Sequence, residues 1–358
     1  MKKILASLAA FIFVFCLAPT SFAAGITISP PKFEFDANPG QIIRGVIKIT
    51  NTDTDTLMLT PSVQDFVASG ETGQPKFVDA KDSDKAISLG NWVNVNGNKI
   101  VTATPKKIAE VPFTITVPSD AEPGGHYGAI FFAPPAGSGQ VGVAQRIGAL
   151  VLVRVKGDIN ESGKLDIFGT YDKSLEGEKL HETSANTFYS ALPVNFTVRY
   201  QNTGNIHFKP TGKIEISNFG VGLNEIGVQS ILNDGGVEVS KEIVNFLPVN
   251  NERGNTLARS FRSYHTTWEG TPYWYYNEDG TKEIRYKGFP IGYYTAQLTF
   301  DGAGGKSETA TTHFIVFPWQ EASASIVALL ILYFGGTRFF AWRSRRLEAE
   351  FKKKFGVK

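Results

Sequence analysis

In the stretch NFTVRYQNTGNIHFKPTG, residues 195–212, apolar residues alternate with polar ones as far as Gln201. A β-strand with one face in a core and the other in water has this period of two. The polar residues of the strand, Thr197 and Arg199 among them, are therefore expected to face water. Asn202-Thr203 follows as a polar turn, and a second apolar run comes after it. The stretch predicts two strands joined by an Asn-Thr turn.

An earlier stretch, RGVIKITNTDTDTLMLTP at residues 44–61, has the same order when Asn51-Thr52 is aligned with Asn202-Thr203. Short runs rich in Val, Ile, Thr, Phe and Tyr recur between these two stretches and beyond them, separated by Gly, Pro, Asn and Asp. No long segment of this region has helical apolar spacing. The pattern predicts an all-β fold of two tandem immunoglobulin-like β-sandwich domains, with one C-terminal transmembrane α-helix added.

We expect the first domain over residues 24–157, a joint over residues 158–163 and the second domain over residues 164–317. Before them, Lys2 and Lys3 precede an apolar run that ends near small residues, which is the pattern of a secretory signal peptide over residues 1–23. The single cysteine, Cys16, lies in this signal, so no disulfide is expected in the mature chain.

The C-terminal region has the composition of a membrane anchor. Residues 320–342 are mostly apolar and long enough to cross a bilayer, with Trp319 and Trp342 where interfacial aromatic residues occur. Basic residues dominate the tail, residues 343–358, so the positive-inside rule places the tail in the cytoplasm. The sequence predicts a single-pass protein of the cell membrane with its N-terminus and both β domains extracellular.

The charge balance argues against nucleic acid as a partner. Lys2, Lys3 and eight basic residues from Arg338 onward account for ten of the 36 basic residues, and Glu348 and Glu350 for two of the 34 acidic ones. The predicted extracellular part therefore has a net charge near −6. A nucleic-acid-binding surface needs a basic stripe, and this sequence shows none.

The sequence resembles the WxL-interacting proteins of bacterial cell envelopes. The resemblance is strongest in the first domain, in ISPPKFEFDANPGQIIRGVIKITNT (28–52), VPFTITVPSDAEPGGHYGAIFFAPP (111–135) and RIGALVLVRVKG (146–157). The second domain is similar through residues 194–216 and departs from the family pattern over residues 259–288. The resemblance implies a peptidoglycan-binding first domain, a host-binding second domain and a C-terminal membrane helix.

No spacing of residues indicates catalysis. The five histidines show no HExxH pattern, and no serine lies in a GxSxG motif, so the chain is predicted not to be an enzyme.

The joint resembles part of a calcium-binding loop. Loop positions 1, 3, 5 and 9 are occupied by Asp158, Asn160, Ser162 and Asp166. Position 12 is Gly169, where a calcium loop has a glutamate, and no helices are expected on either side. A plain interdomain turn is therefore favoured over a Ca²⁺ site, and no other cofactor is expected.

Aromatic residues are concentrated in WEGTPYWYYNEDGTKEIRYKG, residues 268–288. The candidate binding residues are Trp268, Tyr273, Trp274, Tyr275, Tyr276 and Tyr286. A turn at residues 278–280 predicts a hairpin. Strand alternation sends Tyr273 and Tyr275 to one face, which we expect to complete the core, and Trp274 and Tyr276 to the other. Exposed aromatic residues beside polar ones are typical of sites that bind proteins or stack on sugar rings.

The sequence thus predicts a non-enzymatic, membrane-anchored envelope protein that binds other surface proteins or cell-wall glycan, in adhesion or scaffolding. The alternative is a structural spacer or assembly component without a ligand site of its own. An exposed aromatic segment favours binding, and a buried one favours the spacer.

Overall fold

The computed structural model describes residues 25–135, 146–287 and 291–355, apart from residues 173, 176, 178, 234 and 235. The predicted signal peptide, residues 1–23, lies outside the described residues, as do residues 356–358 of the tail. The chain divides into two compact units, one of Met1–Val67 with Pro75–Asn160 and one of Ala68–Gln74 with Glu161–Lys358. The boundary after Asn160 falls inside the predicted joint, whereas the place of residues 68–74 in the second unit was not expected from the sequence.

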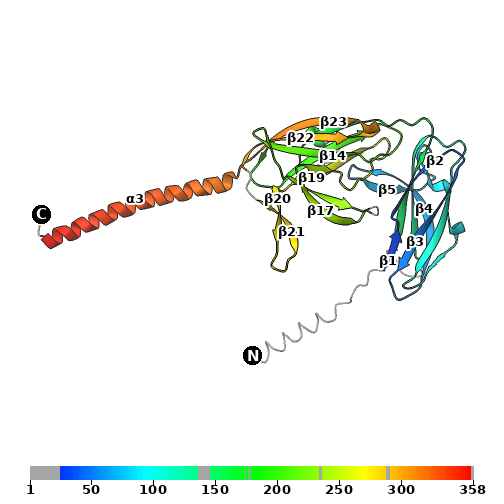
Figure 1. The fold of residues 1–358 in the computed structure, drawn as a ribbon, viewed down its shortest axis with the longest axis horizontal. Helices are drawn as coiled ribbons and strands as arrows, with labels where there is room; N and C mark the ends of the chain where they lie inside the picture. The colour runs from blue at the N-terminus through cyan, green and yellow to red at the C-terminus, as the bar shows by residue number, and fades with distance from the viewer. Residues whose placement is uncertain are drawn as a thin grey trace, which may run out of the picture. The chain divides into compact units, whose positions relative to one another are not determined.

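The first unit consists of two β-sheets (Figure 1). The four-stranded sheet has the order β1 (Ile26–Ser29), β3 (Ile42–Asn51), β8 (Ile108–Thr116), β6 (Val93–Val95). The second sheet has the order β2 (Lys32–Ala37), β10 (Ile147–Val155), β9 (Gly124–Ala133), β4 (Leu57–Ser69), β5 (Gln74–Val78), with β7 (Val101–Ala103) paired to β4. Short 3₁₀ turns, η1 (Gly90–Trp92) and η2 (Asn96–Asn98), flank β6. Strands β2 and β10 are parallel, and the other described pairs of these two sheets are antiparallel.

Alternation along the strands builds the core of the first unit. In β3, Ile43, Ile47 and Ile49 are buried, and the charged residues between them face water. They pack with buried side chains of β8, β9 and β10, such as Phe113 and Phe132. A half-buried strand with period two therefore forms one wall of a sandwich, as the sequence pattern predicts.

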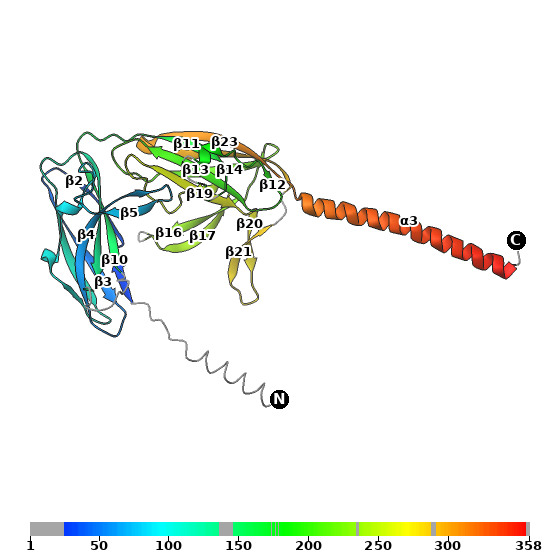
Figure 2. The same ribbon diagram turned by 180° about the vertical axis from the view of Figure 1, so that it is seen from behind.

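The second unit contains two larger sheets and two separate hairpins (Figure 2). One sheet has the order β11 (Gly163–Thr170), β13 (Val194–Asn202), β19 (Phe261–Trp268). The other has the order β12 (Phe188–Tyr189), β23 (Ser307–Val316), β22 (Gly292–Asp301), β14 (Thr211–Asn218), β15 (Val221–Gly222), with β18 (Leu247–Val249) paired to β14. The hairpins are β16 (Gly227–Leu232) with β17 (Glu238–Val244), and β20 (Thr271–Tyr276) with β21 (Lys282–Lys287). A single helical turn, α2 (Lys179–Glu182), precedes β12, and η3 (Ala303–Gly305) joins β22 to β23.

The asparagine turn of the first unit is held by its own side chain. Asn51 ends β3 and is fully buried. Its side-chain amide donates to the carbonyl oxygens of Asp55 and Ala103, both at 2.8 Å, and its oxygen accepts from the Asp53 amide at 2.9 Å. One side chain thereby satisfies two backbone groups of the turn that leaves the sheet and one at the end of β7.

Asn202, at the end of β13, makes the equivalent contacts in the second unit. Its amide donates to the carbonyl oxygens of Ile206 at 2.8 Å and Leu257 at 2.9 Å, and its oxygen accepts from the Gly204 amide at 2.9 Å. The aligned sequences therefore form the same turn. With the two sandwiches and the helix, the structure confirms the predicted fold class.

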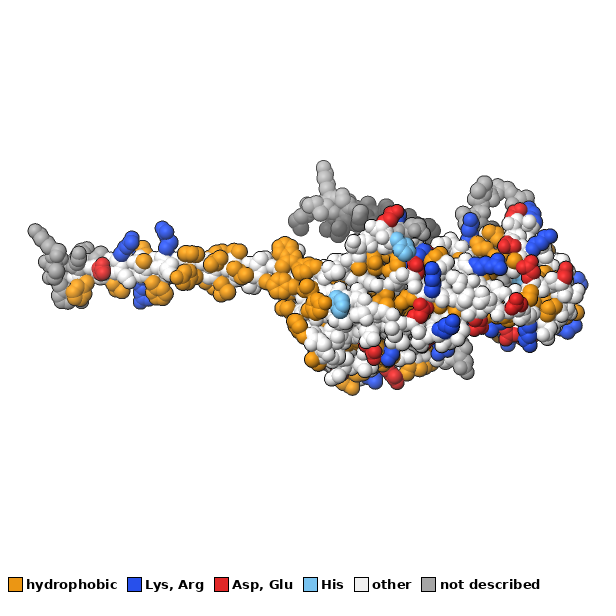
Figure 3. Space-filling model, turned by 90° about the horizontal axis from the view of Figure 1, so that it is seen from above, with side chains coloured by type: hydrophobic (Ala, Val, Ile, Leu, Met, Phe, Trp, Pro, Cys, Tyr) orange, Lys and Arg blue, Asp and Glu red, His pale blue; other side chains and the backbone are white. Residues whose placement is uncertain are grey.

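The chain ends in α3 (Trp319–Phe355), a helix of 37 residues. Within the described residues, its part Trp319–Glu348 is long and apolar enough to span a membrane, with a mean hydropathy of 1.7 in its most apolar window. Figure 3 shows apolar side chains around this part of the helix. The helix does not stop at residue 342 but continues through the basic tail, where Arg, Leu, Glu, Ala and Lys all favour helix.

Candidate binding surface

The predicted aromatic hairpin is present as the β20–β21 sheet, separate from both larger sheets. Its turn is closed by a hydrogen bond from the Gly280 amide to the Asn277 carbonyl oxygen at 3.0 Å, and Gly280 has a φ of 82°. A positive φ is easy only for glycine, which explains the Asp-Gly pair at this turn. The register pairs Trp274 with Ile284 and Tyr275 with Glu283. Cross-strand partners share a face, so the two faces can be assigned.

The first face of the hairpin carries Tyr273 and Tyr275 and is covered by charged groups. The Arg285 guanidinium lies 3.4 Å from the ring centroid of Tyr275, and Lys287 lies 5.7 Å from that of Tyr273. Arg285 also donates to the Glu283 carboxylate at 2.6 Å. The prediction that Tyr273 and Tyr275 complete the core is therefore wrong. The hairpin is not a layer of the sandwich, and cations cover these rings.

The second face carries Pro272, Trp274, Tyr276, Ile284 and Tyr286, and we call these five residues the aromatic face. Tyr276 is 68% exposed and Tyr286 is 38% exposed. Lys282, opposite Tyr276 in the register, has its ammonium 4.5 Å from the Trp274 ring centroid. Partial burial raises the pKa of Tyr286, with a smaller contribution from the nearby Glu269 carboxylate. No residue of this face in the two strands is a carboxylate or a carboxamide.

Trp268, also predicted to be a binding residue, lies in the second core. It is 1% exposed, and its ring packs against Tyr294 at 4.9 Å and Phe314 at 5.9 Å between centroids. As the last residue of β19, it precedes the hairpin and belongs to a sandwich strand. Its predicted place on an exposed edge is therefore wrong.

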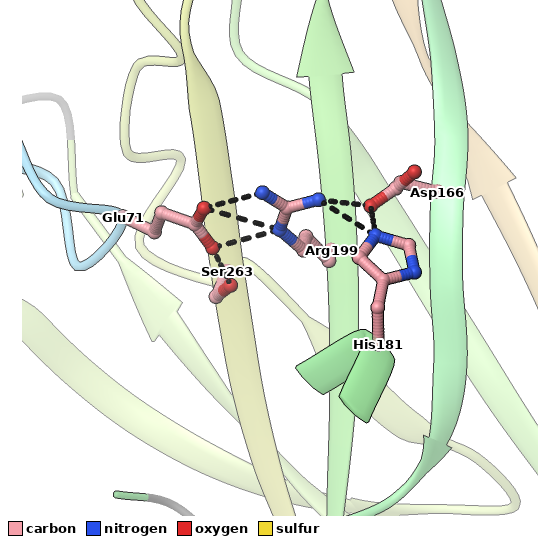
Figure 4. A network of polar contacts seen from close by, with 5 residues as sticks. All are labelled: Glu71, Asp166, His181, Arg199 and Ser263. Carbon is pink, nitrogen blue, oxygen red and sulfur yellow. Dashed lines mark hydrogen bonds and ion pairs between the residues drawn. The ribbon is translucent and has the colours of Figure 1, made fainter. Parts of the chain in front are cut away.

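A second concentration of chemistry is the Arg199 cluster, formed by Glu71, Asp166, His181, Arg199 and Ser263 within the second unit (Figure 4). Arg199 is 2% exposed. It donates to both carboxylate oxygens of Glu71, from Nη2 at 2.6 Å and from Nε at 2.9 Å, and Nη1 contacts the Asp166 carboxylate. Its guanidinium also stacks on Phe261, with Cζ 3.9 Å from the ring centroid. A bidentate pair of this kind compensates a buried guanidinium with charge and hydrogen bonds together.

Glu71 is also held by Ser263, whose hydroxyl donates to Oε2 at 2.9 Å and whose amide donates to the Glu71 carbonyl oxygen at 2.8 Å. Burial by itself would raise the pKa of the Glu71 carboxyl. The hydrogen bonds from Arg199 and Ser263 and the charge of Arg199 outweigh burial, so the pKa of Glu71 lies below its ordinary value. Glu71 raises the pKa of Arg199 in turn. Residues 68–74 are thus fixed in the second unit by an ion pair.

The structure uses Asp166 differently from the calcium-loop interpretation. The register of β11 against β13 shifts between Leu165 and Ile167, which makes Asp166 the extra residue of a β-bulge. The bulge aims its carboxylate at Arg199 and at His181 Nε2, which is 3.1 Å away. Because Gly163–Thr170 is a strand, it cannot curl around an ion as a calcium loop does.

Ser162 contacts Thr203 Oγ1 at 2.8 Å, and the predicted ligands Asp158 and Asn160 belong to the first unit. In the part of the chain that the structure describes, no group of three or more His, Cys, Asp and Glu side chains is arranged to hold a metal.

The buried cluster was not predicted from the sequence. Alternation placed Thr197 and Arg199 on a face towards water, but both are buried. Segments distant in the chain cover this face: residues 68–74 supply Glu71 and α2 supplies His181. The only local signal is an arginine in the middle of an apolar strand.

No protein-family model matches this chain, and no curated protein matches it. The solved structures similar to it include the class 5 fimbriae chaperone CfaA, with a TM-score of 0.33, 11% identity and coverage of 81% of this chain and 99% of that chain. The Pseudomonas aeruginosa CupB2 chaperone has a TM-score of 0.33 at 9% identity, covering 80% of this chain and 100% of that one. The E. coli chaperone DraB has a TM-score of 0.32 at 10% identity, covering 82% and 98%. With TM-scores this low, the fold rests on the strand topology of the chain itself.

Proposed function

We propose that this chain is a membrane-anchored, non-enzymatic protein of the cell envelope whose second unit binds a protein partner through the aromatic face of the β20–β21 hairpin. The exposure of Tyr276 carries the proposal: at 68% it is the most exposed aromatic side chain of the hairpin, and it shares its face with Trp274, Ile284 and Tyr286. Pro272 is buried and Trp274 and Ile284 are half-buried, so the open part of the face is formed by Tyr276 and Tyr286. An apolar face that is exposed at its tyrosines favours a binding protein over a spacer.

The chemistry of the face favours a protein over a glycan. Sugar hydroxyl groups are usually held by carboxylates and carboxamides beside a ring to stack on, and the residues of the aromatic face in β20 and β21 include neither. The Glu269 carboxylate, which lies outside the two strands, is near Tyr286. Lys282 also occupies one side of the Trp274 ring. Trp and Tyr beside an aliphatic residue are typical of the centre of a protein interface.

The other parts of the proposal follow from the ends of the chain. Helix α3 supplies the anchor, and the basic residues after its apolar part favour the cytoplasm for the C-terminus and the outside for both units. The resemblance to WxL-interacting proteins supports a role at the cell surface with a second, partner-binding domain. Peptidoglycan binding by the first unit is part of the same resemblance.

Two neighbouring tyrosines give the test a matched control, since Tyr276 and Tyr275 lie on opposite faces of one strand. A photo-crosslinking amino acid replaces each in turn in the full chain in cells, and adducts are identified by mass spectrometry. We expect a protein adduct from position 276 and none from position 275. Equal adducts from both positions, or none from either, would contradict the proposal, and a glycan adduct from position 276 would replace the protein partner by cell-wall glycan.

With the crosslinked protein in hand, Trp274→Ala in the detergent-solubilised chain should weaken its capture by about 2 kcal/mol, which is roughly 30-fold. The loss would come from an interface aromatic, so the free energy of unfolding should change by less than about 1 kcal/mol. A large loss of stability would instead show that Trp274 packs in the unit.

A further inference from the structure

The end of the larger sheet of the second unit, where β23 leads to α3, carries a group of exposed apolar side chains. Phe188 in β12 and Tyr293 in β22 both pair with Ile315 in β23, so the three side chains lie side by side on the outer face of the sheet. Their exposed fractions are 47%, 41% and 40%. Phe317, at 40%, and Trp319, at 51%, follow on the chain. We call these five residues the sheet-end patch.

The short connection between β23 and α3 places the patch at the start of the candidate membrane helix. Strand β23 ends at Val316 and α3 begins at Trp319, so only two residues separate them. The three Cα–Cα steps from Val316 to Trp319 span at most about 11 Å. Phe317 is fixed to the sheet end by its amide, which donates to the Tyr189 carbonyl oxygen at 2.8 Å. Figure 3 shows apolar side chains continuing from the helix onto the adjoining end of the unit.

The outer face of the same strands becomes polar away from α3. The next outward residues of β22 are Thr295, Gln297 and Thr299, and those opposite them in β23 are His313, Thr311 and Thr309. The apolar surface is thus confined to the strand ends nearest the helix. The apolar surface begins at the helix and ends within one residue pair along the strands. An apolar zone this narrow, next to a membrane helix, is what the interfacial layer of a bilayer would cover. Trp and Tyr are the residues enriched at that boundary.

We infer that the sheet-end patch inserts into the interfacial layer of the bilayer that α3 crosses, so that this end of the second unit lies on the lipid surface. The inference rests on the anchoring role of α3 in the proposed function. The sheet-end patch contacts lipid: its tyrosine and tryptophan lie among the head groups, and Phe188 and Ile315 reach the boundary of the acyl chains. The patch would then limit how far the sheet end can tilt away from the membrane.

The sequence allows a direct test in the full chain, because its one cysteine, Cys16, falls in the predicted signal peptide. Single-cysteine variants Tyr293→Cys, Gln297→Cys and Leu330→Cys are purified, labelled with a small fluorophore and reconstituted in phosphatidylcholine vesicles containing nitroxide-labelled lipid. Positions 293 and 297 are on one face of one strand, about 13 Å apart along it. Leu330 reports on the helix itself. Phe188→Cys repeats the measurement from a neighbouring strand, in case Tyr293→Cys fails to fold.

We expect lipid quenching at positions 330, 293 and 188 to be several-fold stronger than at position 297, and iodide in the buffer to quench position 297 most. Quenching at 330 without quenching at 293 and 188 would overturn the docking of the patch and leave the anchor intact. Equal lipid quenching at 293 and 297 would also overturn it, because the boundary would not follow the patch. Absence of quenching at 330 would refute the anchor and the inference with it.

Discussion

Two arginines of the second unit stack on aromatic rings, yet their surroundings differ. Arg199 lies 3.9 Å from the Phe261 ring centroid and is 2% exposed, with Glu71 and Asp166 as partners. Arg285 lies 3.4 Å from the Tyr275 ring centroid on the open hairpin, and its side chain is 45% exposed. The contact between guanidinium and ring is similar in both, but of the two arginines only Arg199 is shielded from water. The buried Arg199 therefore contributes to stability. The exposed Arg285 covers an aromatic ring on a hairpin that lies outside the sandwich.

The largest expected effect is the loss of the buried arginine. In Arg199→Ala, the carboxylates of Glu71 and Asp166 lose their cation while they remain largely buried. Breaking a buried ion pair from one side costs about 3–5 kcal/mol. We expect the free energy of unfolding of the full chain in detergent, measured by denaturant titration, to fall by this amount. A loss below about 1 kcal/mol would mean that water reaches the cluster and that Arg199 contributes no more to the free energy of unfolding than Arg285 does.

The stability that the buried cluster contributes should depend on pH through Glu71. Its pKa in the folded chain is lower than its unfolded value of about 4.3, so the bond to Arg199 contributes its full stability above that pH. The contribution should be lost as the pH falls from there through the lowered folded pKa. In Glu71→Gln this part of the acid dependence should disappear. Unfolding titrations of the wild type and of Glu71→Gln between pH 6 and pH 3, a window of about three units around the unfolded pKa, measure this pH dependence. Identical pH dependence of stability in the two proteins would exclude Glu71 as the titrating group.

The smallest effect is expected from the exposed arginine. Arg285→Ala removes the cation over Tyr275 and the pair with Glu283, but the two groups that remain, the Tyr275 ring and the Glu283 carboxylate, are open to water. We expect no measurable change in the midpoint of unfolding, with Arg199→Ala as the matched comparison. A shift as large as that of Arg199→Ala would show that the hairpin is held as tightly as the cluster and would remove the distinction between the two regions.

Local patterns were sufficient for much of the fold. The strand β13, the asparagine turns after Asn51 and Asn202, and the Asp-Gly turn of the aromatic hairpin depend on residues within a few positions of one another. The structure shows all three where the sequence places them. These features follow from the period of a strand and from turn chemistry, which act over short distances.

The predictions that were wrong concern which face of a strand is covered by other segments of the chain. Alternation correctly separated Tyr275 from Tyr276, but it could not tell that the hairpin forms a sheet of its own outside both layers of the sandwich. It also separated Arg199 from Val198, yet Glu71, 128 residues earlier, turns the expected water face into a buried one. A bulge at Asp166 points towards Arg199 a carboxylate that the less favoured calcium-loop interpretation had counted as a ligand. Each error concerns a contact between distant segments, for which a single sequence carries no local signal.

The position of residues 68–74 has a consequence for the order of folding. Glu71 is synthesised 128 residues before Arg199 and 192 residues before Ser263, the two side chains of the second unit that donate hydrogen bonds to its carboxylate. Strands β4 and β5, which flank this segment, can pair as soon as they leave the ribosome or the membrane, but their connecting turn has no counter-charge until Arg199 of β13 arrives. Closing so long a loop costs entropy that only the finished ion pair and its neighbours offset. Residues 68–74 therefore cannot complete their native contacts before β13 and β19 have been synthesised, and a nascent chain carries Glu71 without its cation over the 128 residues up to Arg199.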